Sequence, residues 1–358
     1  MNTISLADKD KLNELASASN EYVLKGLPKK SWAMILGEQD LGKSKMMFSL
    51  AYSLATNIDI IGLLPSSTED RKPRKVAIWA SEEDLGWASR KVLAHMSKFS
   101  PDVLDAVQAN VTLIDDSNED GDKEYLFTDE LKVNTRFVDA LTEQLEGVDV
   151  LIIDTLRDAM GIGDEVNEDN KVKVLLSKLV RDADCSVVYL HHPRKSDVGA
   201  SISQLSTASG SGFSRTNAKA RVHYTLTRDR KSDELEVSFA VKANNIPRDE
   251  RVPIKLAWLE MGEHSIQVDA SNKDAIISKL TSGQLTESNE LPPKVSETET
   301  PKPKVQRRPA KKRALAVTEQ VVHKIEASSK TPSNLSSSVR SLRSQAVKLK
   351  SGSNEDQV

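Results

Sequence analysis

Cysteine, apolar runs and export features are all scarce in this sequence of 358 residues. The single cysteine, Cys185, excludes an intramolecular disulfide, and its position in an apolar run predicts a buried free thiol in a reducing compartment. No apolar stretch approaches the roughly 20 residues that a membrane-spanning helix needs. Residues 1–15 also lack the apolar centre of an export signal. We therefore expect a cytoplasmic protein that does not enter a membrane.

The sequence also lacks an excess of charge of either sign. Lysine and arginine together number 50 and aspartate and glutamate 53, so the formal net charge is −3. This balance argues against a surface coated in basic charge for nucleic acid. It leaves room for a local basic patch, because a partner responds to the distribution of charge more than to its sum.

Composition divides the chain into four parts. Residues 1–16 form a polar N-terminal extension, and residues 17–270 have the composition of a folded domain. Residues 271–316 are rich in proline and charge and cannot bury enough apolar surface to offset chain entropy, so we expect a disordered linker. Residues 317–358 form a basic tail rich in serine and lysine, with helical spacing over 317–327.

In residues 17–270, short apolar runs alternate with longer amphipathic stretches. This pattern predicts an α/β fold with a doubly wound, mostly parallel sheet covered by helices. The expected strands are Trp32–Leu36, Val76–Ala80, Val111–Ile114, Val148–Ile153 and Ser186–Leu190. The expected helices are Lys43–Ala55, Asp84–Met96, Thr128–Leu145 and Lys171–Asp182. Two alternating runs, Val222–Thr227 and Leu235–Val241, are expected to add an antiparallel hairpin at the C-terminal edge of the sheet.

A glycine-containing loop joins the first expected strand to the first expected helix. Its sequence, Gly-Glu-Gln-Asp-Leu-Gly-Lys-Ser, matches G-x-x-x-x-G-K-[ST] in full, and the flanking strand and helix disfavour a chance turn. Backbone N–H groups and the helix N-terminus would bind phosphates, while Lys43 would neutralise the β- and γ-phosphates and Ser44 would bind Mg²⁺. Asp40 is unusual, because it places a carboxylate in a loop that binds anions. We expect ATP to be bound by Gly37, Glu38, Gln39, Asp40, Leu41, Gly42, Lys43, Ser44 and Lys45.

The apolar run Val148–Ile153 ends in an acid, Asp154. A buried strand of a doubly wound sheet presents its last side chain at the edge where ligands bind. Asp154 is therefore expected to hold Mg²⁺ through water, together with Ser44. Capping of the following segment is the alternative, because aspartate is common after strands.

Several further motifs follow one another in the order of a known group of ATPases. After the phosphate loop come Ser-Glu-Glu at 81–83, Leu-Ile-Ile-Asp-Thr-Leu-Arg at 151–157, Tyr-Leu-His-His-Pro-Arg-Lys at 189–195, Lys-Ala-Arg at 219–221 and Val-Lys-Ala-Asn-Asn at 241–245. This succession resembles the RepA-type hexameric replicative helicases, within the wider RecA and DnaB-like superfamily. The resemblance covers residues 26–258. It implies a RecA-like fold and an ATP-dependent DNA translocase that acts as a ring, with a hexamer as the expected form, in the replication of a plasmid, phage or mobile element.

The resemblance implies a catalytic acid and a phosphate sensor. Glu82 would orient the attacking water, with Glu83 as its substitute, and capping of the next helix is the alternative for either acid. His192 would sense the γ-phosphate, with His191 ranked second. A structural histidine at a strand end is the alternative there.

The resemblance also implies two cations that act on the neighbouring subunit. Arg221 matches the arginine finger of the family, and Lys242 matches a second basic group at the same junction. A guanidinium suits the finger role because its planar fork stays charged and grips phosphate oxygens. Without the resemblance, solvated charges on strands would be the preferred interpretation of both.

Two loops, at 157–169 and 195–219, follow the strands nearest the phosphates, and the resemblance implies that they line the channel of the ring. The basic residues expected to contact single-stranded DNA are Arg194, Lys195, Arg215 and Lys219. Phe213 is the exceptional aromatic in this region, so we expect sequence-independent contacts. A plain flexible surface loop is the alternative.

The expected partners are single-stranded DNA, further copies of this chain and, through the tail, a primase or replication initiator. The tail is equally compatible with a DNA-binding arm or a solvated extension. A non-unwinding ATP-binding regulator, such as a helicase loader or repair mediator, remains the main alternative because no separate unwinding or primase domain is evident. A nucleotide-transfer kinase ranks lower, since the sequence shows no lid or acceptor site.

Overall fold

The computed structural model describes residues 5–18, 21–161, 165–197, 205–207, 209–228, 234–239 and 241–282. Most of the predicted linker, the basic tail and the helical spacing over 317–327 lie outside these residues. In the described part of the chain, no helix is both long and apolar enough to cross a membrane.

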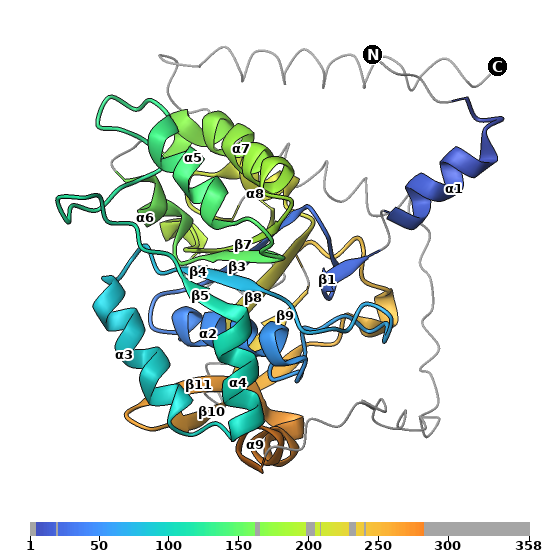
Figure 1. Cartoon of the computed structure of the whole chain (residues 1–358). Coiled ribbons are helices and arrows are strands. Elements are labelled where there is room, and N and C mark those ends of the chain that lie inside the picture. The colour runs from blue at the N-terminus through green and yellow to red at the C-terminus, as the bar shows by residue number, and fades with distance from the viewer. Residues whose placement is uncertain are drawn as a thin grey trace, which may run out of the picture. The chain divides into compact units, whose positions relative to one another are not determined.

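A nine-stranded sheet forms the centre of the domain (Figure 1), with the order β11-β10-β9-β8-β3-β7-β6-β4-β5. Its strands are β3 (Trp32–Gly37), β4 (Val76–Trp79), β5 (Val111–Leu113), β6 (Val150–Ile153), β7 (Ser186–His191), β8 (Val222–Arg228), β9 (Leu235–Ser238), β10 (Ile254–Met261) and β11 (His264–Asp269). From β8 to β5 every neighbouring pair is parallel, whereas β9, β10 and β11 are added antiparallel. The predicted mostly parallel sheet with antiparallel additions at its C-terminal edge is confirmed.

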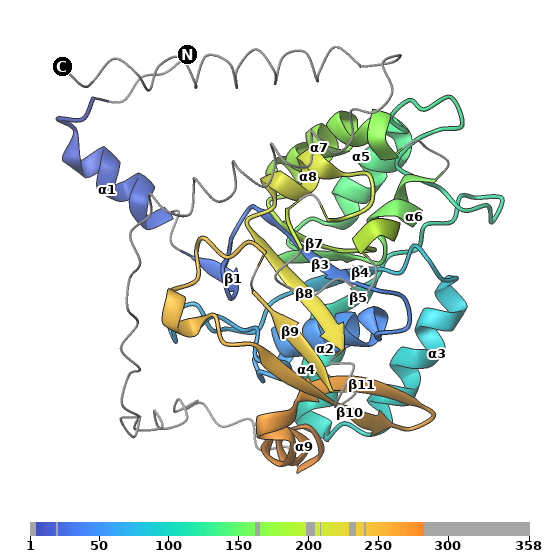
Figure 2. The same cartoon turned by 180° about the vertical axis from the view of Figure 1, so that it is seen from behind.

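Helices lie on both faces of this sheet (Figure 2). The helices of the described residues are α1 (Lys9–Ala18), α2 (Lys43–Thr56), α3 (Leu85–Met96), α4 (Pro101–Asn110), α5 (Thr135–Gln144), α6 (Leu156–Met160), α7 (Glu165–Asp182), α8 (Ser214–Lys219) and α9 (Lys273–Ser282). One apolar core joins α2 and α4 to the sheet, and a second joins α5, α6 and α7 to the opposite face. Adjacent residues of β6 alternate between them: Ile152 packs in the first core, and Leu151 and Ile153 pack in the second.

The β10–β11 hairpin curls around α2, which lies between it and the central strands in both views (Figures 1 and 2). The backbone N–H of Gln267 in β11 donates to the Ser49 hydroxyl of α2 at 3.0 Å. Helix α9 then closes the domain, with Ile276 and Leu280 buried and the Leu280 carbonyl accepting from the Ser100 N–H at 2.8 Å. The ordered body therefore extends past the predicted boundary at residue 270 and includes the first residues of the predicted linker.

Local signals explain where the elements differ from the predictions. The helix expected from Thr128 begins only at Thr135, because the Asn134 side chain caps it by accepting from the Phe137 N–H at 3.2 Å. Helix α4 was not predicted, although Ser100 followed by Pro101 is a favourable start for a helix. Cys185 is buried, as predicted, and burial raises the pKa of its thiol to about 12.

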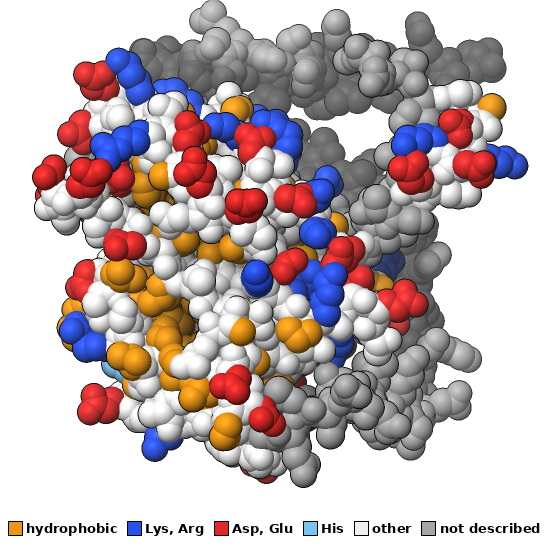
Figure 3. Space-filling model, viewed as in Figure 1, with side chains coloured by type: hydrophobic (Ala, Val, Ile, Leu, Met, Phe, Trp, Pro, Cys, Tyr) orange, Lys and Arg blue, Asp and Glu red, His pale blue; other side chains and the backbone are white. Residues whose placement is uncertain are grey.

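The outer surface mixes charges of both signs, in keeping with the near-neutral net charge (Figure 3). On the face shown, apolar side chains gather in the region of α3 and α4. Trp87 and Leu93 of α3 are exposed by 52% and 65%. This helix borders the cavity described next.

Candidate active site

The phosphate loop turns from β3 into α2 at the carboxyl end of the parallel strands. Gly42 caps α2 with φ at 82°, a left-handed conformation that favours glycine. A Cβ atom there would lie 2.5 Å from Trp258 Cη2 and 2.6 Å from Gln267 Nε2. The end of the loop is therefore packed directly against the β10–β11 hairpin. Asp40 is exposed and lines the cavity described below.

Lys43 is the buried cation of the site, with only 7% of its surface exposed. Its Nζ donates to the Glu38 carbonyl at 2.7 Å and lies 3.3 Å from His192 Nδ1. Burial lowers the pKa of Lys43, and the charges of Asp154, Glu82 and Asp40 oppose this effect. The lysine is thus held at the base of the loop among acids that favour its charged form.

Asp154 stands at the end of the apolar strand β6, where the sequence placed it. The residue is 4% exposed, and its Oδ1 has no hydrogen-bond partner in the part of the chain that the structure describes. Burial raises the pKa of Asp154 to about 7, with Glu82 adding to the effect and a hydrogen bond from Ser44 opposing it. A buried carboxylate oxygen without a partner is rare in folded proteins and calls for a ligand or ordered water. The oxygen fits the expected role at a metal site shared with Ser44.

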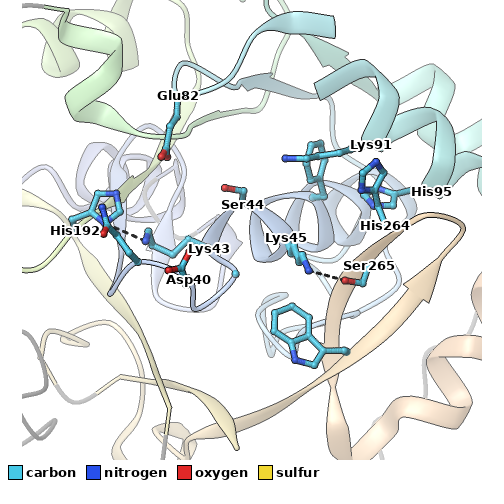
Figure 4. A pocket seen from close by; sticks show the side chains of 14 residues that line it. Asp40, Lys43, Ser44, Lys45, Glu82, Lys91, His95, His192, His264 and Ser265 are labelled. Atoms are coloured by element: carbon cyan, nitrogen blue, oxygen red, sulfur yellow. Dashed lines mark hydrogen bonds between the residues drawn. The ribbon is translucent and has the colours of Figure 1, made fainter. Parts of the chain in front are cut away.

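The three acids after β4 have three different surroundings. Asp84 caps α3 by accepting from the Trp87 N–H at 2.8 Å, and Glu83 forms an ion pair with Lys91 at 2.5 Å. Glu82 instead lines the cavity and points into it (Figure 4). Its pKa is raised, first by burial of the carboxyl and then by Asp158. The geometry favours Glu82 over Glu83 as the acid that faces a substrate.

The two adjacent histidines also face different surroundings. His191 is buried, its Nε2 lies 2.7 Å from the Ser211 carbonyl, and burial lowers its pKa to about 4. His192 lines the cavity beside Lys43, and its pKa is lowered first by burial and then by that lysine. His192 is therefore the histidine placed to meet a phosphate, whereas His191 supports the following loop.

Of these residues, Lys43, Glu82 and His192 line one cavity of about 610 Å³ (Figure 4). The inner end is formed by the phosphate loop, Glu82 and His192. The outer end is formed by α3 and by the β10–β11 hairpin, through Trp258, His264 and Ser265. The hairpin residues were not anticipated from the sequence, because no motif links them to the phosphate loop.

Arg221 and Lys242 lie away from this cavity, at the amino end of β8. The Arg221 N–H donates to the Trp32 carbonyl at 2.8 Å, at the start of β3 and far along that strand from the loop. Lys242 Nζ donates to the Ala218 carbonyl at 2.5 Å. Its pKa is lowered by burial and then by Arg221, so the two cations are neighbours, but they do not share a cavity with Lys43 within one subunit.

Phe213, the exceptional aromatic of this region, is not available for base stacking. Its side chain is fully buried and packs against His191, with ring centroids 5.2 Å apart. Asp169 holds the start of α8 by accepting from the N–H groups of Arg215 and Thr216 at 2.6 and 2.9 Å. Arg194 and Arg215 are exposed, whereas residues 198–204 of the second predicted channel loop lie outside the described part.

The whole chain was compared with known proteins. No curated protein matches the sequence. Among solved structures, one described as an "ATPase Domain" is similar at 13% identity and a TM-score of 0.49, covering 74% of this chain and 99% of that one. "The Structure Of A DnaB-Like Replicative Helicase And Its Interactions With Primase" gives 14% identity and a TM-score of 0.48, covering 74% of this chain and 67% of that one.

A family model described as "AAA domain" matches residues 5–198, which is more than half of the chain. The matched region contains the phosphate loop, Glu82, Asp154 and His192. It ends before Arg221 and Lys242, so the match does not bear on those two cations. With its phosphate loop between β3 and α2, the chain belongs to the AAA domain family and is a P-loop ATPase.

Proposed function

We propose that this protein is an ATP-dependent DNA translocase, a RepA-type replicative helicase that works as a ring oligomer, with a hexamer as the expected form. The observation that supports this best is the division of charged groups between the two ends of the sheet. Lys43, Glu82 and His192 share the cavity at the carboxyl end. Arg221 and Lys242 lie together at the amino end, where only a second subunit could present them to a nucleotide.

In this proposal the cavity binds the triphosphate of ATP. The loop N–H groups and Lys43 would hold the phosphates, and Ser44 with Asp154 would hold Mg²⁺, whose remaining ligands would come from phosphates and water. The metal would neutralise phosphate charge. The Oδ1 atom of Asp154 supports this assignment, since it is buried near Ser44 and Lys43 and has no hydrogen-bond partner among the described residues.

Glu82 would position the attacking water and accept its proton. Its carboxyl points into the cavity, and its raised pKa brings it closer to the working pH of a general base. His192 would report the presence of the γ-phosphate, because it already lies 3.3 Å from Lys43. A change in the position of His192 would alter the conformation of the loop that follows β7.

The neighbouring subunit would complete the site with Arg221 and Lys242. Such a finger neutralises charge on the transferred phosphoryl group and is worth about 10³–10⁵ in kcat in P-loop enzymes. The exposed Arg194, Arg215 and Lys219 would contact the backbone of single-stranded DNA. A primase or replication initiator is the proposed protein partner, and a plasmid, phage or mobile element is the proposed setting.

Strand displacement on a forked DNA duplex tests this function. The full chain should separate the strands with ATP, Lys43→Ala should not, and native mass measurement should show a ring in the presence of nucleotide. ATP hydrolysis that DNA stimulates without any strand separation would instead identify a non-unwinding regulator, such as a loader or repair mediator. Phosphoryl transfer to a small acceptor would exclude both.

A further inference from the structure

The outer end of the cavity is not used by the chemistry proposed above. In Figure 4, Glu82 and His192 lie on one side of Ser44, and Lys91, His95, His264 and Ser265 lie on the other. A triphosphate that reaches from His192 past Ser44 to Lys45 would direct its remaining part to this outer end.

Trp258 supplies an aromatic surface there. It projects from β10, is 36% exposed, and has its ring edge against Gly42 of the phosphate loop. Lys45 Nζ lies over one side of the ring, 4.6 Å from its centroid, and donates to Ser265 Oγ at 2.9 Å. The indole is thus held by packing at its edge and lines the cavity. An aromatic ring that borders a cavity is a surface on which bases stack.

His95 supplies a buried polar atom at the outer end. The residue is 1% exposed and lines the cavity, and its Nδ1 lies 2.9 Å from the Tyr52 hydroxyl. Its Nε2 has no hydrogen bond to any described residue. Burial lowers the pKa of His95 to about 4, so the ring is neutral near pH 7 and offers one donor or one acceptor at Nε2. A buried polar atom of this kind beside a cavity points to a ligand.

We propose that the outer end of the cavity is a nucleoside site, in which Trp258 stacks the base of a purine nucleotide and His95 Nε2 bonds to its ribose or base edge. A purine is favoured because its two rings cover more of the indole than a pyrimidine does. The inference rests on nucleotide binding by the phosphate loop, as proposed above. It adds the residues that distinguish a nucleotide from a bare polyphosphate.

Binding of Mg-ADP and of Mg-tripolyphosphate to the full chain tests this site, because only ADP carries a nucleoside. Trp258→Ala should weaken ADP binding about tenfold, the usual effect of removing one stacking partner, and should leave tripolyphosphate binding unchanged. Trp258→Phe should restore most of the loss. Trp87→Ala is the matched control, since Trp87 is also exposed and carries a cation, Arg90, 4.2 Å from its ring, but does not line the cavity.

His95→Asn tests the second contact. Asparagine can still meet the Tyr52 hydroxyl from the position of Nδ1 but leaves nothing at the position of Nε2. ADP binding should weaken about fivefold, as for the loss of one hydrogen bond, with tripolyphosphate again unaffected. The wild-type chain should bind ADP more tightly than CDP, and Trp258→Ala should reduce that preference.

Two results would overturn the nucleoside site: ADP binding unchanged in Trp258→Ala, or an equal loss of ADP and tripolyphosphate binding in that variant. The second would show that Trp258 only supports Gly42. Equal binding of ADP and CDP would overturn the assignment to purines. A wild-type chain that binds neither ligand would instead overturn the proposed function itself.

Discussion

Charged side chains have different surroundings at the two ends of the central parallel strands. At the carboxyl end, Lys43 and Asp154 are both buried, and each alters the pKa of the other. At the amino end, Arg221 is exposed and Lys242 bonds to a neutral carbonyl, with the other cation as its charged neighbour. Placing like charges together is unfavourable unless an anion comes between them. The amino end thus resembles one half of a site, and the carboxyl end resembles the other.

The largest effect is expected at the carboxyl end. Lys43→Ala should lower ATP hydrolysis by at least about 10³-fold, because both phosphate binding and charge neutralisation are lost. Steady-state phosphate release measures the change. Lys178→Ala is the control, since that lysine is exposed and pairs with Asp139 on the surface. An unchanged rate in Lys43→Ala would refute the assignment of the site.

At the amino end, Arg221→Ala should lower kcat about 10³-fold and leave ATP binding intact, because the proposed finger would act only on the neighbour's phosphates. Mixing this variant with Lys43→Ala should restore activity at about a quarter of the interfaces of a ring, where an intact loop meets an intact finger. Hydrolysis by the mixture compared with each variant alone gives the readout. Normal turnover in Arg221→Ala would refute the finger role.

A smaller effect on kcat should distinguish Glu82 from its neighbour Glu83. Glu82→Gln should lower kcat about 10²-fold without weakening ATP binding, because a positioned base contributes about that much. Glu83→Gln should stay within about threefold of the wild type, since Glu83 is occupied by Lys91. Single-turnover hydrolysis distinguishes them. A larger loss of kcat in Glu83→Gln than in Glu82→Gln would instead assign the catalytic role to Glu83.

The smallest effect is expected at Arg74, a cation at the amino end that is paired with a carboxylate. Arg74 is buried and pairs with Glu21 at 3.0 Å, and Lys72 with Arg74 lowers the pKa of Glu21 to about 2. Since the pKa of Glu21 is depressed, its stabilisation is complete above about pH 4.5 and is lost as the pH falls toward 2. Glu21→Gln should lower the free energy of unfolding by about 1–2 kcal/mol at pH 7.

Urea unfolding of Glu21→Gln and the wild type across this pH range provides the measurement. The difference between the two proteins should close between about pH 4.5 and 2. A difference that does not depend on pH would show that Glu21 stabilises the fold by packing alone. Such a result would also weaken the contrast between Arg74, a structural cation, and Arg221.

The sequence could predict the parallel part of the sheet and the acid at its edge because both depend on local pattern. Fully apolar runs such as Val150–Ile153 must be buried on both faces, and the residue after such a run, Asp154, must appear at the edge. The phosphate loop is equally local. Its residues are contiguous, and the flanking strand and helix set their geometry.

The outer wall of the cavity could not be predicted in the same way. Trp258 and Gln267 reach Gly42 from more than 200 positions along the chain, and the pattern of β10 is too irregular to mark an inner face. The burial of Phe213 could not be predicted either, because this residue lies in a glycine- and serine-rich stretch without an apolar pattern. The choice between Glu82 and Glu83 required the position of Lys91, which only the fold supplies.

The contact between Gly42 and the β10–β11 hairpin has a consequence for any shortened form of this protein. Gln267 Nε2 donates to the Leu41 carbonyl at 2.9 Å, so the last turn of the loop is shaped by strands that come at the end of the domain. A fragment that stops before residue 254 would retain the complete motif. It would lack the hairpin that packs against the loop. Such a fragment would match the sequence motif without forming the phosphate-binding pocket.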